Sequence, residues 1–129
     1  MTATIIPRSH SENSPEVGRV MAKAAFNAAR ELGLKQIELA TIIGVSKSVV
    51  SRDLKDGGYS LKGQPFNLAA YLVRIFRSLD AIAGGDPDVI KGWMANDNLD
   101  LNGRPKELIR TAAGLVDVMN YLDAARAPV

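Results

Sequence analysis

The sequence predicts an all-α protein, and three of its features support that prediction. Apolar residues recur every three or four positions along most of the chain, as they do on the buried face of a helix. Ser14-Pro15 and Asp86-Pro87 each place a capping residue before a proline, which is typical of a helix start, and Gly33 and Gly84-Gly85 fit helix ends. β-like stretches such as Ile5-Ile6 have no partner of similar character, so no sheet is expected.

Three helices are expected before residue 60. The first begins after Ser14 and ends at Gly33, the second covers about Lys35 to Ile43, and the third runs from its cap Ser46 through Leu54. The side chains expected in the core are Val17, Val20, Met21, Ala24, Ala25, Ala28 and Leu32 of the first helix and Ile37, Ala40 and Ile43 of the second.

The rest of the chain is expected to form a long helix from Pro65 to Gly84-Gly85, a helix after Asp86, a short turn at Pro105 and a last helix from about Thr111. In the polar segment before Pro105, Leu99 and Leu101 are expected to point into the core. The other expected core residues are Leu68, Leu72, Ile75, Phe76, Leu79, Ile82, Val89, Ile90, Trp93, Met94, Leu115, Val118, Met119 and Leu122.

Composition excludes several classes of protein. The 129 residues suit one domain or two very small ones, and 47% hydrophobic residues are ordinary for a soluble chain. No apolar run approaches the roughly 18 residues needed to cross a bilayer, and residues 1–13, expected to be a mobile tail, lack the apolar core of a secretion signal. The absence of cysteine excludes disulfides and thiolate metal sites, so we expect a cytoplasmic protein without membrane contact.

No arrangement of residues in the sequence predicts catalysis. There is no glycine-rich phosphate loop, no nucleophile elbow and no HExxH pattern, and the single histidine, His10, falls in the expected tail. The carboxylate pairs Asp86/Asp88 and Asp97/Asp100 sit at turns or helix starts, where capping explains them. We therefore expect a protein that is not an enzyme and that binds no cofactor and no metal.

Charge is distributed unevenly along the chain. Residues 1–79 hold 11 Lys and Arg against 6 Asp and Glu, whereas residues 80–129 hold 5 Lys and Arg against 8 Asp and Glu. A basic front half suits contact with phosphate and an acidic rear half suits a basic partner, although chance surface composition explains the difference about equally well.

Residues 36–54, QIELATIIGVSKSVVSRDL, have the pattern of a helix-turn-helix DNA-reading unit. Its first helix needs a small residue where the second helix crosses it, and Ala40 provides one. Four residues later the turn needs positive φ, which Gly44 tolerates. Val50 packs the second helix back onto the first, and Ser46 caps the second helix near DNA. The alternative is a plain helical hairpin with a solvated polar face.

The polar residues of this unit fall on the side that would face DNA. Arginine reads guanine with two hydrogen bonds, serine and lysine contact bases or phosphates, and a glutamine at the start of the supporting helix lies near a phosphate. Because one short recognition helix contacts few base pairs, we expect a homodimer on operator DNA. The expected DNA contacts are Gln36, Ser46, Lys47, Ser48, Ser51, Arg52 and Lys55.

The part of the chain after Leu79 carries a second series of features. A Gly85-Asp86 turn precedes a helix with the pair Trp93-Met94, a polar loop follows with Leu101, Gly103 and Pro105, and Gly114 lies in the last helix. In these features the sequence resembles the toxin-binding domain of Xre/MbcA/ParS-type antitoxins. The loop is one residue shorter than the usual spacing, and Trp-Met replaces the family's Trp-Leu.

The resemblance implies a type II antitoxin, all-α, in which an Xre/Cro-like helix-turn-helix bundle packs on a small helical toxin-binding domain. Such antitoxins neutralise a RES-domain toxin that consumes NAD⁺, and they commonly repress their own operon. The implied division is a tail at 1–13, a helix-turn-helix domain at 14–64, a connecting or dimerising helix at 65–84 and a toxin-binding domain at 85–129. The expected toxin contacts are Trp93, Leu101, Arg104, Tyr121, Arg126, Pro128 and Val129.

Several alternatives remain open at this point. Trp93 either completes the C-terminal core or anchors a partner, and Tyr121 is equally ambiguous. An extended tail from Arg126 to Val129 either inserts into the toxin cleft that holds NAD⁺ or makes no contact. The chain as a whole could also be a stand-alone regulator whose C-terminal helices dimerise or sense a ligand, or an inhibitor that has lost DNA binding.

Overall fold

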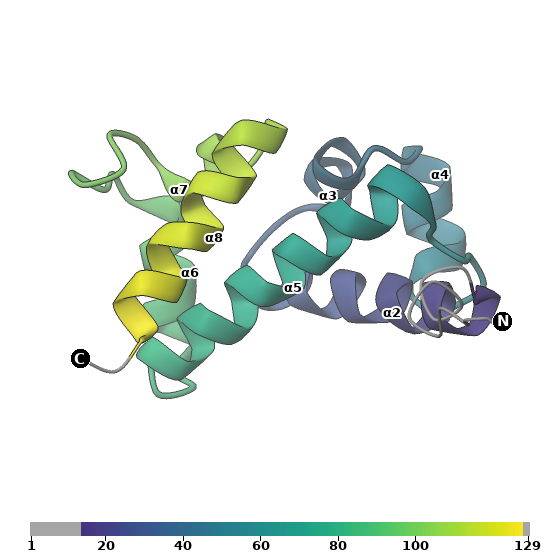
Figure 1. Ribbon diagram of the computed structural model, residues 1–129, viewed down its shortest axis with the longest axis horizontal. Coiled ribbons are helices and arrows are strands. Elements are labelled where there is room, and N and C mark those ends of the chain that lie inside the picture. Colours follow the sequence, from purple (N-terminus) through teal and green to yellow (C-terminus); the bar gives the residue numbers. More distant parts are fainter. Residues whose placement is uncertain (1–13, 128–129) are drawn as a thin grey trace, which may run out of the picture.

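A computed structural model of the chain describes residues 14–127, and over that range it contains helices and loops but no strand (Figure 1). The all-α prediction is therefore confirmed. The tail expected at 1–13 and the predicted toxin contacts Pro128 and Val129 lie outside the described residues. The helices are α2 (Pro15–Glu31), α3 (Gln36–Ile43), α4 (Lys47–Val49), the π-helical η1 (Val50–Leu54), α5 (Gly63–Ile82), α6 (Pro87–Ala95), α7 (Pro105–Leu108) and α8 (Ala112–Arg126).

Helix α5 occupies the centre of the molecule. It crosses the structure diagonally in Figure 1, with α2, α3 and α4 gathered at its N-terminal end and α6, α7 and α8 at the other. Its buried apolar side chains therefore serve both halves of one continuous core: they are Leu68, Ala69, Leu72, Ile75 and Leu79. None of the described helices is long and apolar enough to cross a membrane.

Helix starts follow the capping residues that the sequence contains. The Asp86 carboxylate accepts hydrogen bonds from the backbone N–H groups of Asp88 (3.0 Å) and Val89 (3.4 Å), and the Thr111 hydroxyl accepts one from Gly114 (3.1 Å). These contacts satisfy N–H groups that have no partner inside the helix. The prediction for the fourth helix was slightly wrong, because α5 already begins at Gly63.

Five side chains that the sequence placed in the core are exposed instead: Ile37, Val20, Ile82, Leu99 and Val89, the last being 50% exposed. Ile37 is 50% exposed because the buried face of α3 carries Leu39 and Ile43, and a residue two positions before Leu39 points about 200° away from it. Val20, Ile82 and Leu99 are 66%, 47% and 97% exposed. Val20 borders a groove between helices, Ile82 lies at the end of α5, and Leu99 lies in the loop between α6 and α7.

The close packing of α7 against α8 predicts a steric effect at Gly114. A methyl group added to Gly114 would collide with the backbone carbonyl of Leu108, which cannot move without displacing α7. We expect Gly114→Ala to lower the free energy of unfolding by about 1–3 kcal/mol, measured by urea denaturation.

Gly92 provides the matched control, because it is also a helical glycine but has open space around it. The nearest heavy atom to a methyl group at Gly92 is the Asn96 side-chain nitrogen, at 3.9 Å. Gly92→Ala should be neutral or stabilising by up to about 1 kcal/mol, as helix propensity dictates. Equal effects of the two substitutions would contradict the packing argument.

Candidate functional site

The helix-turn-helix unit is formed by α3, the turn at Gly44, and the helix made of α4 and η1. Ala40 is 4% exposed and Val50 is fully buried, so the two helices cross at the small residue as predicted. Gly44 has φ 77°, a left-handed conformation that glycine adopts without strain. No atom crowds the Gly44 Cα, so backbone conformation rather than lack of space explains the glycine.

The recognition helix presents its polar side chains to solvent. The Ser46 hydroxyl accepts a hydrogen bond from the Val49 N–H (3.1 Å), which confirms the predicted cap. The Arg52 Nε–H and the Ser51 hydroxyl both donate to the backbone carbonyl of Ser48, at 3.4 and 3.3 Å. Both side chains thus rest on their own helix and are available to turn toward another acceptor. The predicted DNA contacts are all exposed: Gln36, Ser46, Lys47, Ser48, Ser51, Arg52 and Lys55.

An aromatic pair lies on the C-terminal side of the molecule. Trp93 of α6 stacks on Tyr121 of α8, with ring centroids 6.2 Å apart and planes inclined by 21°. Trp93 is half-buried and packs against the core. The Tyr121 hydroxyl donates a 2.7 Å hydrogen bond to the Asp100 carboxylate. This hydrogen bond, together with partial burial, raises the pKa of Tyr121 above 10.0.

The loop between α6 and α7 is ordered by its own backbone. Asn98 and Gly103 exchange backbone hydrogen bonds of 2.9 and 3.2 Å, and the Asn98 side chain accepts one from the Leu101 N–H (3.1 Å). We call residues 98–103 the hairpin. Leu101 is half-buried against the core, whereas Leu99 at the tip is almost fully exposed. Leu101 therefore points inward as predicted, and the prediction for Leu99 was wrong because the tight turn carries it away from the protein.

Charged residues pair at both ends of the C-terminal helices. Arg104, at the base of the hairpin, lies 3.5 Å from Asp97 and 3.8 Å from Glu107. At the far end of α8, Arg126 donates a 3.2 Å hydrogen bond to the hydroxyl of the buried Ser78. The sequence had suggested an extended tail beginning at Arg126. In the structure Arg126 is instead the last residue of α8. Of the predicted toxin contacts that are described, Arg126 contacts Ser78 of α5, whereas Trp93 and Tyr121 contact each other.

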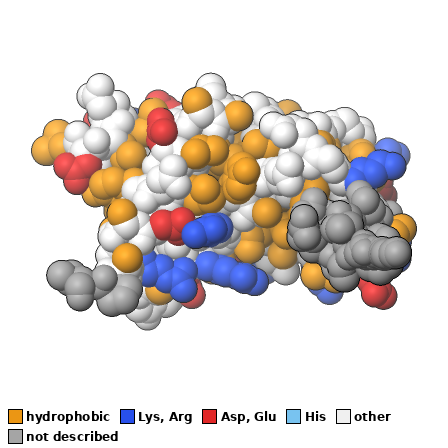
Figure 2. Space-filling view, viewed as in Figure 1, with side chains coloured by type: hydrophobic (Ala, Val, Ile, Leu, Met, Phe, Trp, Pro, Cys, Tyr) orange, Lys and Arg blue, Asp and Glu red, His pale blue; other side chains and the backbone are white. Residues whose placement is uncertain are grey.

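Arg126 borders a groove between α2, α5 and α8, with a volume of about 720 Å³. Within it Arg74 pairs with Asp123 at 2.9 Å, and the Ser78 hydroxyl donates to the same carboxylate at 3.2 Å. Figure 2 shows hydrophobic side chains in the middle of this face, with basic and acidic side chains beside them.

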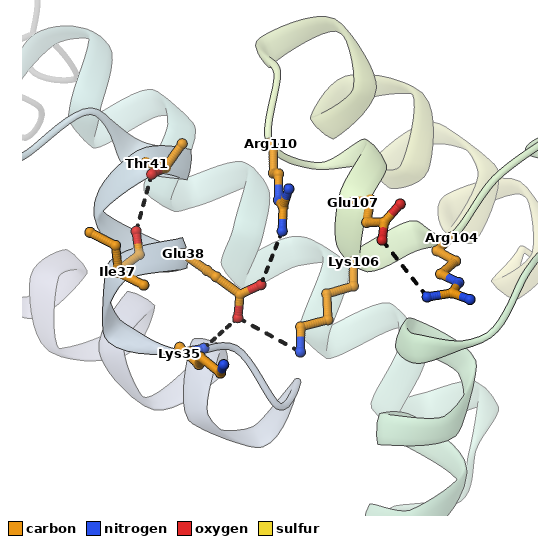
Figure 3. Close-up of polar contacts among 8 residues, drawn as sticks. All are labelled: Lys35, Ile37, Glu38, Thr41, Arg104, Lys106, Glu107 and Arg110. Atoms are coloured by element: carbon orange, nitrogen blue, oxygen red, sulfur yellow. Dashed lines mark hydrogen bonds and ion pairs between the residues drawn. The ribbon is translucent and has the colours of Figure 1, made fainter.

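Glu38 connects the two halves of the molecule, and sequence reasoning missed this role. Its carboxylate accepts a 2.8 Å hydrogen bond from the Lys35 N–H at the start of α3 (Figure 3). The same carboxylate lies 3.7 Å from the side-chain nitrogens of both Lys106 and Arg110, at α7 and just beyond it. Glutamate three residues after the N-cap is a familiar capping arrangement, but nothing local identifies partners 70 residues away.

Comparison with protein families assigns both halves of the chain. Residues 11–74 match the model of the antitoxin Xre-like helix-turn-helix domain. Residues 78–127 match the antitoxin Xre/MbcA/ParS C-terminal toxin-binding domain. The chain carries both domains of a toxin–antitoxin antitoxin. No curated protein matches the sequence significantly.

The Xre-like domain and the toxin-binding domain fit the geometry already described. The first contains the α3–Gly44–α4/η1 unit with its exposed polar face, and the second contains the aromatic pair, the hairpin and the packed Gly114. The boundary between the two matched segments falls within α5, and this helix contacts α2 and α3 of the first domain and α8 of the second. The DNA-binding antitoxin architecture expected from the sequence is therefore confirmed.

The exposed position of Arg52 predicts a selective effect on DNA binding. Arg52→Ala removes a side chain that bonds only its own helix, so the melting temperature should hardly change. Specific binding to DNA from upstream of the gene should weaken by about 1–3 kcal/mol, measured by fluorescence anisotropy. Unchanged affinity would remove Arg52 from the set of base-reading residues; Arg19→Ala, an exposed arginine of α2, is the control.

The Tyr121–Asp100 hydrogen bond predicts a change in tyrosine titration. Because the Asp100 carboxylate stabilises the protonated phenol, Asp100→Asn should lower the pKa of Tyr121. The titration is measured from the ultraviolet absorbance of tyrosinate. A tyrosine whose pKa is raised by folding stabilises the folded state at pH values below its pKa in the unfolded chain. This contribution is lost as the pH rises through the pKa of the folded state. Asp97→Asn, on the same loop, should leave the titration unchanged; an equal shift would contradict the assignment.

Proposed function

We propose that this antitoxin neutralises a RES-domain toxin that consumes NAD⁺, and that it represses its own operon by binding operator DNA as a homodimer. The observation that carries the proposal is the union of a toxin-binding domain with a helix-turn-helix unit in one chain. The order and spacing of the C-terminal features, which resemble the partners of RES-domain toxins, favour that class of toxin.

The DNA part of the proposal is supported by the chemistry of the recognition helix. Lys47, Ser48, Ser51 and Arg52 project from a helix whose opposite side is fixed in the core by Val50 and Leu54. A helix held in this way presents a fixed set of donors to the major groove. Its short length favours a dimer, because two half-sites supply the specificity that one lacks.

The toxin part is supported by the surface around the aromatic pair. We propose Trp93, Leu101, Arg104 and Tyr121 as toxin contacts on one side of the C-terminal domain, with Arg126 on another. Half-buried aromatic residues held by packing lose little entropy on binding, which suits them to anchor a partner. The excess of acidic residues after residue 79 supports a basic partner surface.

The proposal is tested with the protein encoded by the adjacent reading frame. Co-expressed with this chain, that protein should co-purify, and alone it should consume NAD⁺. Titration with the antitoxin should abolish NAD⁺ consumption at a fixed stoichiometry, and the complex or the free antitoxin should shift DNA from upstream of its own gene. Stable DNA binding without any effect on the adjacent protein would favour a stand-alone regulator instead.

A further inference from the structure

The start of α3 lies between two hollows in the protein surface. The first, of about 400 Å³, is bordered by Arg30 of α2 and by Lys35 and Gln36, among otherwise apolar residues. The second, of about 300 Å³, is bordered by Lys35 again and by Lys106 and Arg110 of the toxin-binding domain. Because Lys35 borders both hollows, these side chains form one stretch of surface that crosses from one domain to the other. We call the four cationic residues the basic band: Arg30, Lys35, Lys106 and Arg110.

The charge that the basic band presents to solvent is positive. Glu38 lies between Lys106 and Arg110 (Figure 3), but its side chain is only 13% exposed, whereas that of Arg110 is 54% exposed. Among the described residues that border the first hollow, none is acidic. In the second hollow Glu107 is paired with Arg104 at 3.8 Å. A partner that approaches from solvent therefore meets cations before it meets the shielded carboxylate.

The cations of the toxin-binding domain keep donors for a second anion. One nitrogen each of Lys106 and Arg110 lies 3.7 Å from the Glu38 carboxylate. A lysine carries three donors and an arginine five, so most of them point elsewhere. Ion pairs of this length between partly exposed groups are weak, and a second anion can compete with Glu38 or share the cation with it.

The basic band is continuous with the DNA-reading unit. Gln36 is the first residue of α3, the supporting helix, where a side chain is expected to lie near a DNA phosphate. It borders the same hollow as Arg30 and Lys35. Phosphates repeat along a DNA strand, so a duplex that reaches Gln36 carries further negative charges past this point.

Resting on the proposed binding of operator DNA, we infer that the basic band binds the phosphate backbone of the same duplex. Lys106 and Arg110 would then make the toxin-binding domain a second part of the chain that contacts DNA. These contacts are made to phosphates and not to base edges, so they add affinity without adding sequence preference. Duplex DNA is favoured over an acidic protein because the band adjoins the residues that face DNA.

The experiment measures binding of the full-length chain to duplex DNA from upstream of its gene, by fluorescence anisotropy at several KCl concentrations. Arg110→Ala and Arg30→Ala should each lower the slope of log affinity against log salt concentration by about 1 for each chain bound. Each should weaken binding to the upstream duplex and to an unrelated duplex by the same factor. A duplex cut back to the bases that the recognition helix reads should bind Arg110→Ala and the unmodified chain equally.

Two further variants separate a phosphate contact from a structural role. Arg77→Ala removes an exposed arginine of α5 outside the basic band and should leave the salt slope unchanged. Glu38→Gln keeps an oxygen that can accept from the Lys35 N–H but removes the negative charge, so it should strengthen DNA binding. Weakening by Glu38→Gln as large as that by Arg110→Ala would mean that the ion pair only positions α3, and would overturn the inference.

The remaining outcomes distinguish this inference from the proposed function. A salt slope of Arg110→Ala equal to that of the unmodified chain, while Arg52→Ala still weakens binding, would overturn the inference alone. Weaker binding of Arg110→Ala to the protein from the adjacent reading frame, with DNA binding unchanged, would assign the basic band to a protein partner and overturn it as well. Failure of the unmodified chain to bind the upstream duplex would instead overturn operator binding.

Discussion

Helix α5 has to bury apolar side chains on two sides at once, and the arrangement of both domains depends on that requirement. Leu68 and Leu72 lie toward its N-terminal half and Ile75 and Leu79 toward its C-terminal half, and all are buried. Helices α2 and α3 cover one part of α5 and α8 covers another. The buried Ser78 of α5 also depends on this packing, because its hydroxyl forms hydrogen bonds with Asp123 and Arg126 of α8. Neither domain can lose α5 without exposing its core.

The shared helix has a polar counterpart in Glu38. One carboxylate caps the start of α3, where Gln36 is exposed toward solvent, and pairs with Lys106 and Arg110 of the toxin-binding domain. At 3.7 Å and partly exposed, each pair stabilises the fold only modestly. Their significance is positional, since the same side chain touches the supporting helix of the DNA-reading unit and the short helix beside the hairpin.

The sequence predicted features that depend on neighbours close along the chain. Ala40, Gly44 and Val50 determine the helix-turn-helix by their spacing alone, and Asp86 caps its own helix. The predictions from the sequence were wrong where the burial or contacts of a residue depend on segments far away along the chain. Ile37 has an apolar side chain, but which face of α3 is buried is decided by α2, α5 and η1. The ion pairs of Glu38 and the Arg126–Ser78 hydrogen bond join residues far apart in sequence, so no local pattern reveals them.

Leu99 is a further residue whose exposure the sequence did not predict. An apolar residue in a polar loop is expected to be buried, and Leu101 is half-buried, but the turn closed by Asn98 and Gly103 directs Leu99 outward. In Figure 1 this loop and the α4 helix lie at opposite ends of the molecule, with α5 between them. The exposed polar side chains of the recognition helix therefore lie at one end of the molecule, and the exposed Leu99 lies in the loop at the other end. One continuous core separates these two surfaces, and Leu68, Leu72, Ile75 and Leu79 of α5 help to form it.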